Sequence, residues 1–130
     1  MARRAVIKKV GLLDEQFSLY FEDSDWCYRM RQAGWDRYYL PFAQIIHYGK
    51  MSTEQLNDEG ISKYYKSLYK FFRKHYGEAS LFVLKCLISL GYGMRLIIYS
   101  LGWAVNFKER ARIKQKINLY LLILRLVFKS

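Results

Sequence analysis

The densest group of potentially reactive side chains is an acidic cluster around residue 23. Glu22, Asp23 and Asp25 place three carboxylates within four residues. Charged carboxylates this close repel one another, so the cluster costs free energy unless a cation or a reaction uses it. A carboxylate at a strand-to-helix junction can also act as a general base toward a hydroxyl group. The alternative is that the acids only favour a helix N-terminus, and the spacing alone leaves both interpretations open.

His47 is a second residue whose type suggests chemistry. Its neutral imidazole can supply a nitrogen ligand to a metal ion. A single histidine at a strand end is nevertheless structural in roughly four cases of five. His47 is therefore a candidate metal ligand whose role the spacing does not decide.

Two short helices are expected around the acidic cluster. Residues 2–10 predict one helix, which Gly11 breaks. A second helix should open at the cluster, with Asp23 or Ser24 as its cap, and should end at Gly34. The cluster is thus expected at the start of the second helix.

The residues after the cluster are expected to form a core and two strands. Trp26, Cys27 and Met30 have the helical spacing of a buried face. Residues 35–40 and 43–48 predict strands on either side of a turn. His47 would stand at the end of the second strand.

Charge is concentrated in the second part of the chain. The sequence of 130 residues is 52% hydrophobic and 18% aromatic, which disfavours disorder. Residues 1–60 carry eight Lys and Arg against nine Asp and Glu, a net charge of −1, and residues 61–130 carry fourteen against two, a net charge of +12. This asymmetry indicates an acidic partner for the second part, either nucleic acid or an anionic membrane.

The two cysteines and the first residues indicate the cellular compartment in which the protein is expected. Cys27 and Cys86 lie in unlike surroundings and suggest neither a disulfide framework nor a zinc site, so a reducing compartment is expected. The basic residues at the start are not followed by the apolar run of a signal peptide.

The second part is expected to be helical and to associate with a membrane. Residues 79–105 are long and apolar enough to span a bilayer. Lys85 and Arg95 would each cost about 2.5–3.5 kcal/mol at its centre. Both flanks are basic, and one span cannot place both on the cytoplasmic side. An in-plane helix or a re-entrant hairpin at the cytoplasmic face is therefore predicted. The membrane-associating cations are Lys85, Arg95, Lys108, Arg110 and Arg112. The alternative is that these helices pack against other protein surfaces.

The order of residues in the first part resembles one family. The chain contains VGLLDEQF at 10–17, LYFEDSDWCYR at 19–29, AGW at 33–35, YLP at 39–41 and HYGKMS at 47–52. This pattern resembles the second half of family 2 glycosyltransferases of the GT-A fold, above all rhamnosyltransferase-like members of bacterial polysaccharide biosynthesis. Residues 67–77 also resemble the helix that follows this half.

The resemblance implies an α/β fold for the first part. Residues 1–52 would be the C-terminal, acceptor-side half of a GT-A domain, residues 53–62 a linker, and residues 63–130 an all-helical, membrane-associating extension. The family's nucleotide-binding half, with its Asp-x-Asp metal motif, has no counterpart in these 130 residues. A separate N-terminal half is therefore an expected partner.

The resemblance also implies roles for the acidic cluster. Asp23 would be the general base that takes a proton from the acceptor hydroxyl. Glu22 and Asp25 would shape the acceptor site or hold Asp23 in place. Arg29 would anchor the helix through the carboxylates.

The donor side follows from the same resemblance. Asp14 and Glu15 would lie near the donor sugar and the acceptor. His47 would help to hold a divalent cation, Mg²⁺ or Mn²⁺, on the donor diphosphate. The cation would offset the negative charge that develops on the leaving group, and a single in-line displacement would invert the sugar.

The sequence therefore predicts a glycosyltransferase that moves a sugar from a nucleotide-sugar donor to a glycan or lipid-linked acceptor. The alternative is a non-catalytic, membrane-associated remnant or binding protein without the donor-binding half. A nucleic-acid binder is disfavoured, because the basic residues interleave with long aliphatic runs and no nucleic-acid motif occurs.

Overall fold

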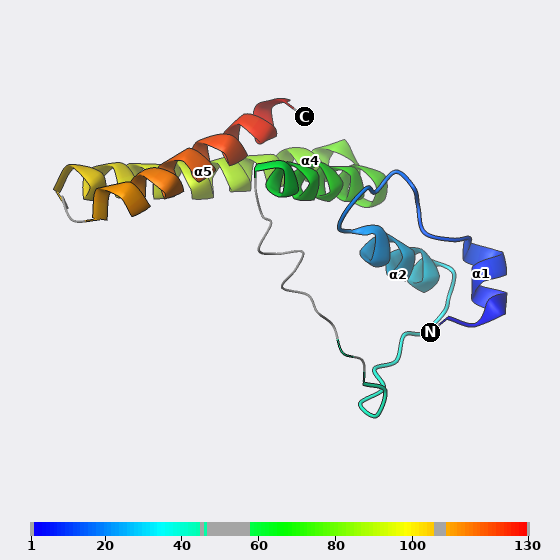
Figure 1. Ribbon diagram of the computed structural model, residues 1–130. Helices are drawn as coiled ribbons and strands as arrows, with labels where there is room; N and C mark the ends of the chain where they lie inside the picture. Colours follow the sequence, from blue (N-terminus) through cyan, green and yellow to red (C-terminus); the bar gives the residue numbers. More distant parts are fainter. Residues whose placement is uncertain (1, 45, 47–57, 106–108, 130) are drawn as a thin grey trace. The chain divides into compact units, whose positions relative to one another are not determined.

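The computed structural model describes residues 2–44, 46, 58–105 and 109–129. The chain divides into two compact units, Met1–Leu56 and Asn57–Ser130. The first unit contains α1 (Arg4–Val10) and α2 (Glu22–Gln32). The second contains α4 (Asp58–Val105) and α5 (Arg110–Lys129), as Figure 1 shows.

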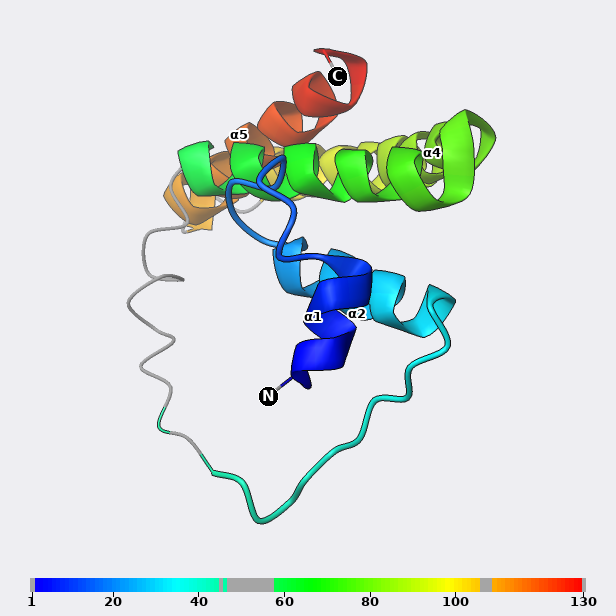
Figure 2. The same cartoon turned by 90° about the vertical axis from the view of Figure 1, so that its right-hand side faces the viewer.

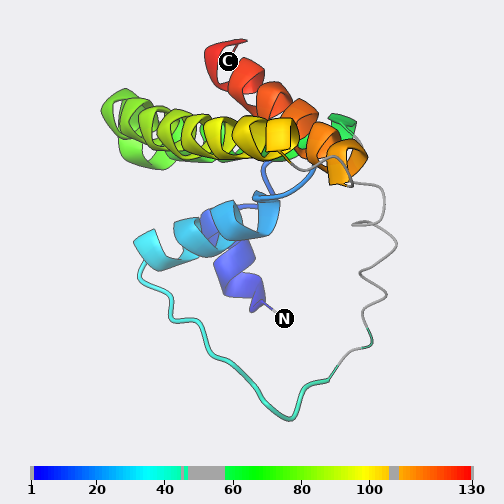
Figure 3. The ribbon, with the colours of Figure 1, turned by 90° about the vertical axis from the view of Figure 1, so that its left-hand side faces the viewer.

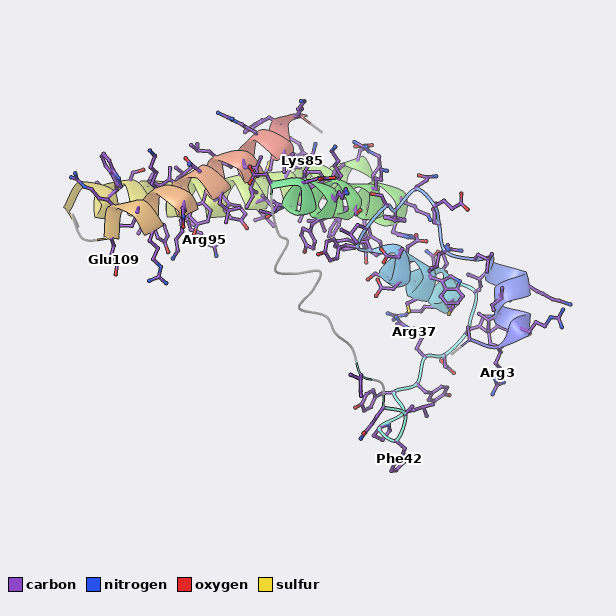
Figure 4. All side chains as sticks on the ribbon, in the orientation of Figure 1. Arg3, Arg37, Phe42, Lys85, Arg95 and Glu109 are labelled. Atoms are coloured by element: carbon purple, nitrogen blue, oxygen red, sulfur yellow. The ribbon has the colours of Figure 1, made fainter. Side chains whose placement is uncertain are left out.

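The expected α/β fold is wrong for the described residues, which form helices and turns but no strand. Residues 35–44 are irregular, including the whole of the strand expected at 35–40; residues 45, 47 and 48 of the second expected strand lie outside the description. A strand pairs its N–H and C=O groups with a neighbouring strand, and no described segment supplies one. Most of the large side chains here are exposed, Phe42 to 95% (Figure 4), whereas Trp35 is half-buried.

The first unit confirms the expected helix before Gly11. Gly11 has a φ of +83°, and its N–H donates to the Ile7 carbonyl at 2.8 Å, which ends α1. This left-handed conformation favours glycine, which has no Cβ. Figure 2 shows α1 beside α2, with which it is in contact.

The second helix ends as expected but begins differently. Gly34, with a φ of +83°, follows the C-cap of α2, and its N–H donates to the Arg31 carbonyl at 3.0 Å. The N-cap is Phe21, which makes no side-chain capping bond. The expected caps are therefore wrong, since Asp23 and Ser24 both lie inside the first turn.

The second unit is built on a helix that folds back on itself. Gly77 interrupts α4 with a φ of +79° and a ψ of 175°, which is not helical. The hydroxyls of Tyr65 and Tyr92 lie 3.0 Å apart, whereas a straight helix would separate these residues by about 40 Å. Residues 58–76 and 78–105 therefore form a hairpin, called here the N-terminal arm and the C-terminal arm (Figure 3).

The core of the second unit joins both arms to α5. Tyr69 from the N-terminal arm is 1% exposed, and Leu81 from the C-terminal arm is 2% exposed. Ile123 and Val127 of α5 complete the buried cluster together with Tyr65. The aromatic side chains of the N-terminal arm thus pack against two other helical segments.

Candidate functional site

Two successive residues in a left-handed conformation lead into the acidic cluster. Tyr20 has a φ of +64° and Phe21 a φ of +69°. This conformation costs a residue other than glycine about 1–2 kcal/mol, and such strain is concentrated at functional sites. The turn places Glu22 and Asp23 as the first two residues of α2.

The three acids of the cluster lie in different environments. Asp25 is fully buried, and its Oδ2 accepts a hydrogen bond from Arg29 Nε at 2.7 Å. Asp23 is exposed, and its Oδ1 accepts from the Ser24 N–H at 2.6 Å and from the Ser24 hydroxyl at 3.3 Å. Glu22 is half-buried, and its Oε2 has no hydrogen-bond partner in the described part of the chain. Of the three, Asp23 is the carboxylate that a substrate can reach from solvent.

Arg29 fastens the loop after α1 to α2. Its Nη1 donates to the Val10 carbonyl at 2.6 Å and its Nη2 to the Leu12 carbonyl at 2.7 Å. The indole N–H of Trp26 donates to the Gly11 carbonyl at 2.9 Å. Sequence reasoning expected Arg29 to anchor the helix through carboxylates, and the pair with Asp25 has that form. It missed the bonds to the loop carbonyls, which no local pattern reveals.

Asp14 and Glu15 lie in the loop between α1 and α2. The Oδ1 of Asp14 accepts from the Gln16 N–H at 2.9 Å, and its carbonyl accepts from the Phe17 N–H at 3.1 Å. Such turns commonly use aspartate. Glu15 is exposed. The position of Asp14 is thus explained by the turn that it stabilises.

The described residues do not form a metal site. No group of three His, Cys, Asp or Glu side chains among them could hold a metal ion. His47 lies outside the described residues, so its role as a metal ligand stays a prediction.

Most of the cations expected at the membrane contact aromatic rings of their own unit. Lys85 Nζ lies 5.2 Å from the centre of the Tyr69 ring, and the Arg95 guanidinium lies 5.3 Å from that of Tyr92. Arg110 lies 4.8 Å from the Trp103 ring centre. Arg112 is exposed, and Lys108 lies outside the described residues. Each ring attracts its cation through the negative charge of its face.

One face of the C-terminal arm is apolar and exposed. Spacings of three and four residues place its side chains on one side of the helix, away from the core residues Leu81 and Tyr92. An exposed apolar surface of this extent is typical of a membrane or protein contact. The side chains of this apolar stripe are Phe82, Val83, Leu87, Leu90, Met94, Ile97, Ile98 and Leu101.

The same helix is long and apolar. Among the described residues, one helical stretch, Asp58–Trp103, is long and apolar enough to cross a membrane by length and composition. Only 6% of its most apolar window is buried, whereas the core helix of a soluble protein is mostly buried. The stretch as a whole is not one straight rod, because it folds back at Gly77.

Part of the chain is similar to a known enzyme. The chain is 34% identical over 71 residues to N-acetylglucosaminyl-diphospho-decaprenol L-rhamnosyltransferase of Mycobacterium tuberculosis, in strains CDC 1551 / Oshkosh and ATCC 25618 / H37Rv. The match covers 55% of this chain but only 23% of the length of that enzyme. No family model and no solved structure matches. The chain is therefore related to a glycosyltransferase and shares part of its length.

Proposed function

We propose that the chain is the acceptor-side part of a family 2 glycosyltransferase of the rhamnosyltransferase-like subgroup. It would transfer a sugar from a nucleotide-sugar donor to a lipid-linked glycan. The observation that carries this proposal is the exposed Asp23 carboxylate, which directly follows the strained turn at Tyr20 and Phe21. The mycobacterial relative supports it, since its name specifies an acceptor on diphospho-decaprenol.

Asp23 is the general base in this proposal. It accepts the proton of the acceptor hydroxyl while that oxygen forms a bond to the anomeric carbon of the sugar. The nucleoside diphosphate leaves from the opposite face with the electron pair of the broken bond, so the sugar inverts. Ser24 holds Oδ1 of Asp23 through its N–H and hydroxyl, and Oδ2 takes the proton. A base positioned in this way contributes about 10²–10⁴-fold to the rate.

The donor would be bound mainly by a separate part of the enzyme. In the proposal, a nucleotide-binding half with an Asp-x-Asp motif binds the donor. A divalent cation on the diphosphate belongs to that half, with His47 as an additional ligand. The proton transfer to Asp23 does not use the cation.

Co-expression with such a nucleotide-binding half tests the base. Sugar transfer to a polyprenyl diphosphate-linked acceptor is measured for the unchanged chain and for Asp23→Asn. This substitution keeps the size of the side chain but removes the base, so transfer should fall at least about 100-fold. Asp36→Asn, which changes another exposed acid of the same unit, is the control. Full transfer by Asp23→Asn would refute the assignment.

The apolar stripe favours a second candidate function, a membrane-associated protein that binds a partner without transferring sugar. In both candidates the C-terminal arm lies in the plane of the cytoplasmic face of the cell membrane. The stripe would contact acyl chains, and the basic residues would contact anionic headgroups. The two candidates differ in the transfer assay, because only the transferase loses a measured activity with Asp23→Asn.

Flotation with anionic liposomes tests the membrane contact. The double substitution Leu90→Asn and Ile97→Asn places two amides in the apolar stripe and should abolish flotation, because polar groups are costly in hydrocarbon. The control is Leu12→Asn with Leu13→Asn, which changes two exposed leucines of the first unit. If the unchanged chain stays unbound at low salt, the membrane proposal fails.

A further inference from the structure

A basic pocket opens between the N-terminal arm and α5. Its volume is about 460 Å³, within the range of about 300–1,000 Å³ that is typical of small-molecule sites. Four of its lining residues are cationic and none is acidic. The arm contributes Ser62, Lys66, Tyr69, Lys70 and Arg73, and α5 contributes Leu126 and Lys129.

The charge of this basic pocket comes from two elements. Lys66, Lys70 and Arg73 follow one another at spacings of four and three residues, so they share one face of the arm. Like charges at such spacings repel one another and destabilise a helix. Lys129 of α5 adds a fourth cation to the pocket. Glu78 pairs with Arg73 Nε at 2.6 Å and offsets one of the four charges. The pocket keeps a net positive charge that suits an anion.

Tyr69 supplies an independent observation. It lines the pocket, is 1% exposed, and its hydroxyl is buried without a hydrogen-bond partner in the part of the chain that the structure describes. Folded proteins seldom leave such a group unpaired, because its lost hydration is not replaced. Burial raises the pKa of Tyr69 to about 12, so at neutral pH the hydroxyl carries its proton and can donate it in a hydrogen bond.

We propose that the basic pocket binds a phosphate or diphosphate group, with Lys66, Lys70 and Lys129 as its charge partners and the Tyr69 hydroxyl as a hydrogen-bond donor. Lysine and arginine are the side chains that most strongly recognise phosphate oxygens. The group is either a soluble phosphate or the headgroup of a lipid, which share this chemistry. The proposal rests on the second unit alone and does not depend on the role of Asp23.

Calorimetric titration of the full chain with sodium pyrophosphate tests the charges. The double substitution Lys66→Gln and Lys70→Gln removes two charge-assisted contacts and should weaken binding at least about tenfold. The control, Lys63→Gln with Lys114→Gln, makes the same change in net charge outside the pocket and should alter affinity by less than about twofold. An equal loss of pyrophosphate affinity in both double variants would refute the proposed site, because binding would then depend only on the overall charge of the chain.

Tyr69→Phe tests the hydroxyl. Removing an unpaired buried hydroxyl should not lower the melting temperature of the free chain. Pyrophosphate affinity should nevertheless fall several-fold, because the bound anion loses a donor. A purely structural role for Tyr69 leaves the affinity unchanged, and that result would overturn its assignment as a ligand.

Vesicles separate the two sources of phosphate. Flotation is compared on vesicles of phosphatidylglycerol mixed with phosphatidylcholine and on phosphatidylcholine alone. If Lys66→Gln with Lys70→Gln lowers flotation on the anionic vesicles more than the control does, the group is a lipid headgroup. If it weakens only pyrophosphate binding, the group is a soluble phosphate. If it changes neither, the proposal fails.

Discussion

Asp23 and Asp25 are two residues apart, yet Asp25 is fully buried and Asp23 is exposed. A helix turns by about 100° per residue, so positions i and i+2 lie on nearly opposite faces. Asp25 therefore points toward Arg29. The Arg29 guanidinium donates hydrogen bonds both to the Asp25 carboxylate and to the loop carbonyls of Val10 and Leu12. One acid of the cluster stabilises the first unit, and the other remains open to solvent.

Substitution of Asp25 should destabilise the first unit. Asp25→Ala leaves the partly buried guanidinium of Arg29 without its carboxylate, so the free energy of unfolding should fall by about 2–4 kcal/mol. Denaturant unfolding followed by tryptophan fluorescence measures this, because Trp26 bonds to the same loop.

Asp23→Ala is the control for this prediction. Its side chain is exposed, so the free energy of unfolding should change by no more than about 0.5 kcal/mol. Equal destabilisation by the two substitutions would contradict the separation of their roles.

At the scale of the elements, Gly77 determines the hairpin of the second unit. Its φ of +79° and ψ of 175° belong to a region that is essentially confined to glycine. A Cβ at Gly77 would meet no atom within 4 Å, so the cost of Gly77→Ala comes from the backbone alone. The free energy of unfolding should therefore fall by about 1–3 kcal/mol. Circular dichroism measures this as a lower melting temperature.

Gly91→Ala provides a matched control with the opposite sign. Gly91 lies inside the C-terminal arm and also has open space around its Cα. Alanine is favoured over glycine in a helix by about 0.5–1 kcal/mol, so this variant should gain stability. A gain in both variants would show that residue 77 is not held at positive φ.

The tyrosine core of the second unit should make it sensitive to alkali. Burial raises the pKa of Tyr69 from 10.0 to about 12, and burial with the hydrogen bond to Tyr92 raises the pKa of Tyr65. The folded state thus holds these protons more tightly than the unfolded state. Stability is complete below about pH 10 and falls as the pH rises toward 12, by about 2–3 kcal/mol for Tyr69.

Thermal unfolding followed by circular dichroism between about pH 9 and pH 12 measures this loss of stability. The range includes both the ordinary and the raised pKa of the phenol. Tyr69→Phe removes its share and should make the decline shallower. Tyr38→Phe, which changes an exposed tyrosine of the first unit, should leave the decline unchanged. Identical declines in all three chains would show that Tyr69 does not hold its proton more tightly when folded.

The sequence predicted those elements that depend on local interactions. The helix before Gly11 and the end of α2 at Gly34 follow from glycine positions and helical periodicity. The strands expected at 35–40 and 43–48 were wrong as far as they are described, because β structure depends on a partner strand. The pair of Asp25 with Arg29 has the i, i+4 spacing that the sequence shows. The basic pocket could not be predicted, because Lys66 and Lys129 meet only through packing of the arm on α5.

At the scale of the whole molecule, charge and apolar surface coincide in the second unit. Residues 61–130 carry a net charge of +12, and the exposed apolar stripe belongs to the same segment. Membrane attachment in the plane of the interface uses both features, apolar burial and attraction to anionic lipid. Lys85 and Arg95 contact rings on the core side of the C-terminal arm, away from the stripe. An in-plane helix therefore leaves both charges outside the hydrocarbon, whereas a spanning helix would bury them at about 2.5–3.5 kcal/mol each.

Depth measurements distinguish an in-plane helix from a spanning one. One variant carries a fluorescent label on the exposed Cys86, and a second carries it on Leu101→Cys, with the other cysteines replaced by serine. Quenching by lipids with quenchers at known depths gives the depth of each label. An in-plane arm places both labels at one depth, about 5–10 Å into the boundary between headgroups and acyl chains. A spanning arm separates them by about 22 Å along the membrane normal, because each residue rises 1.5 Å. Two labels at different depths, with one near the bilayer centre, would refute in-plane attachment, and equal shallow depths would exclude a span through this arm.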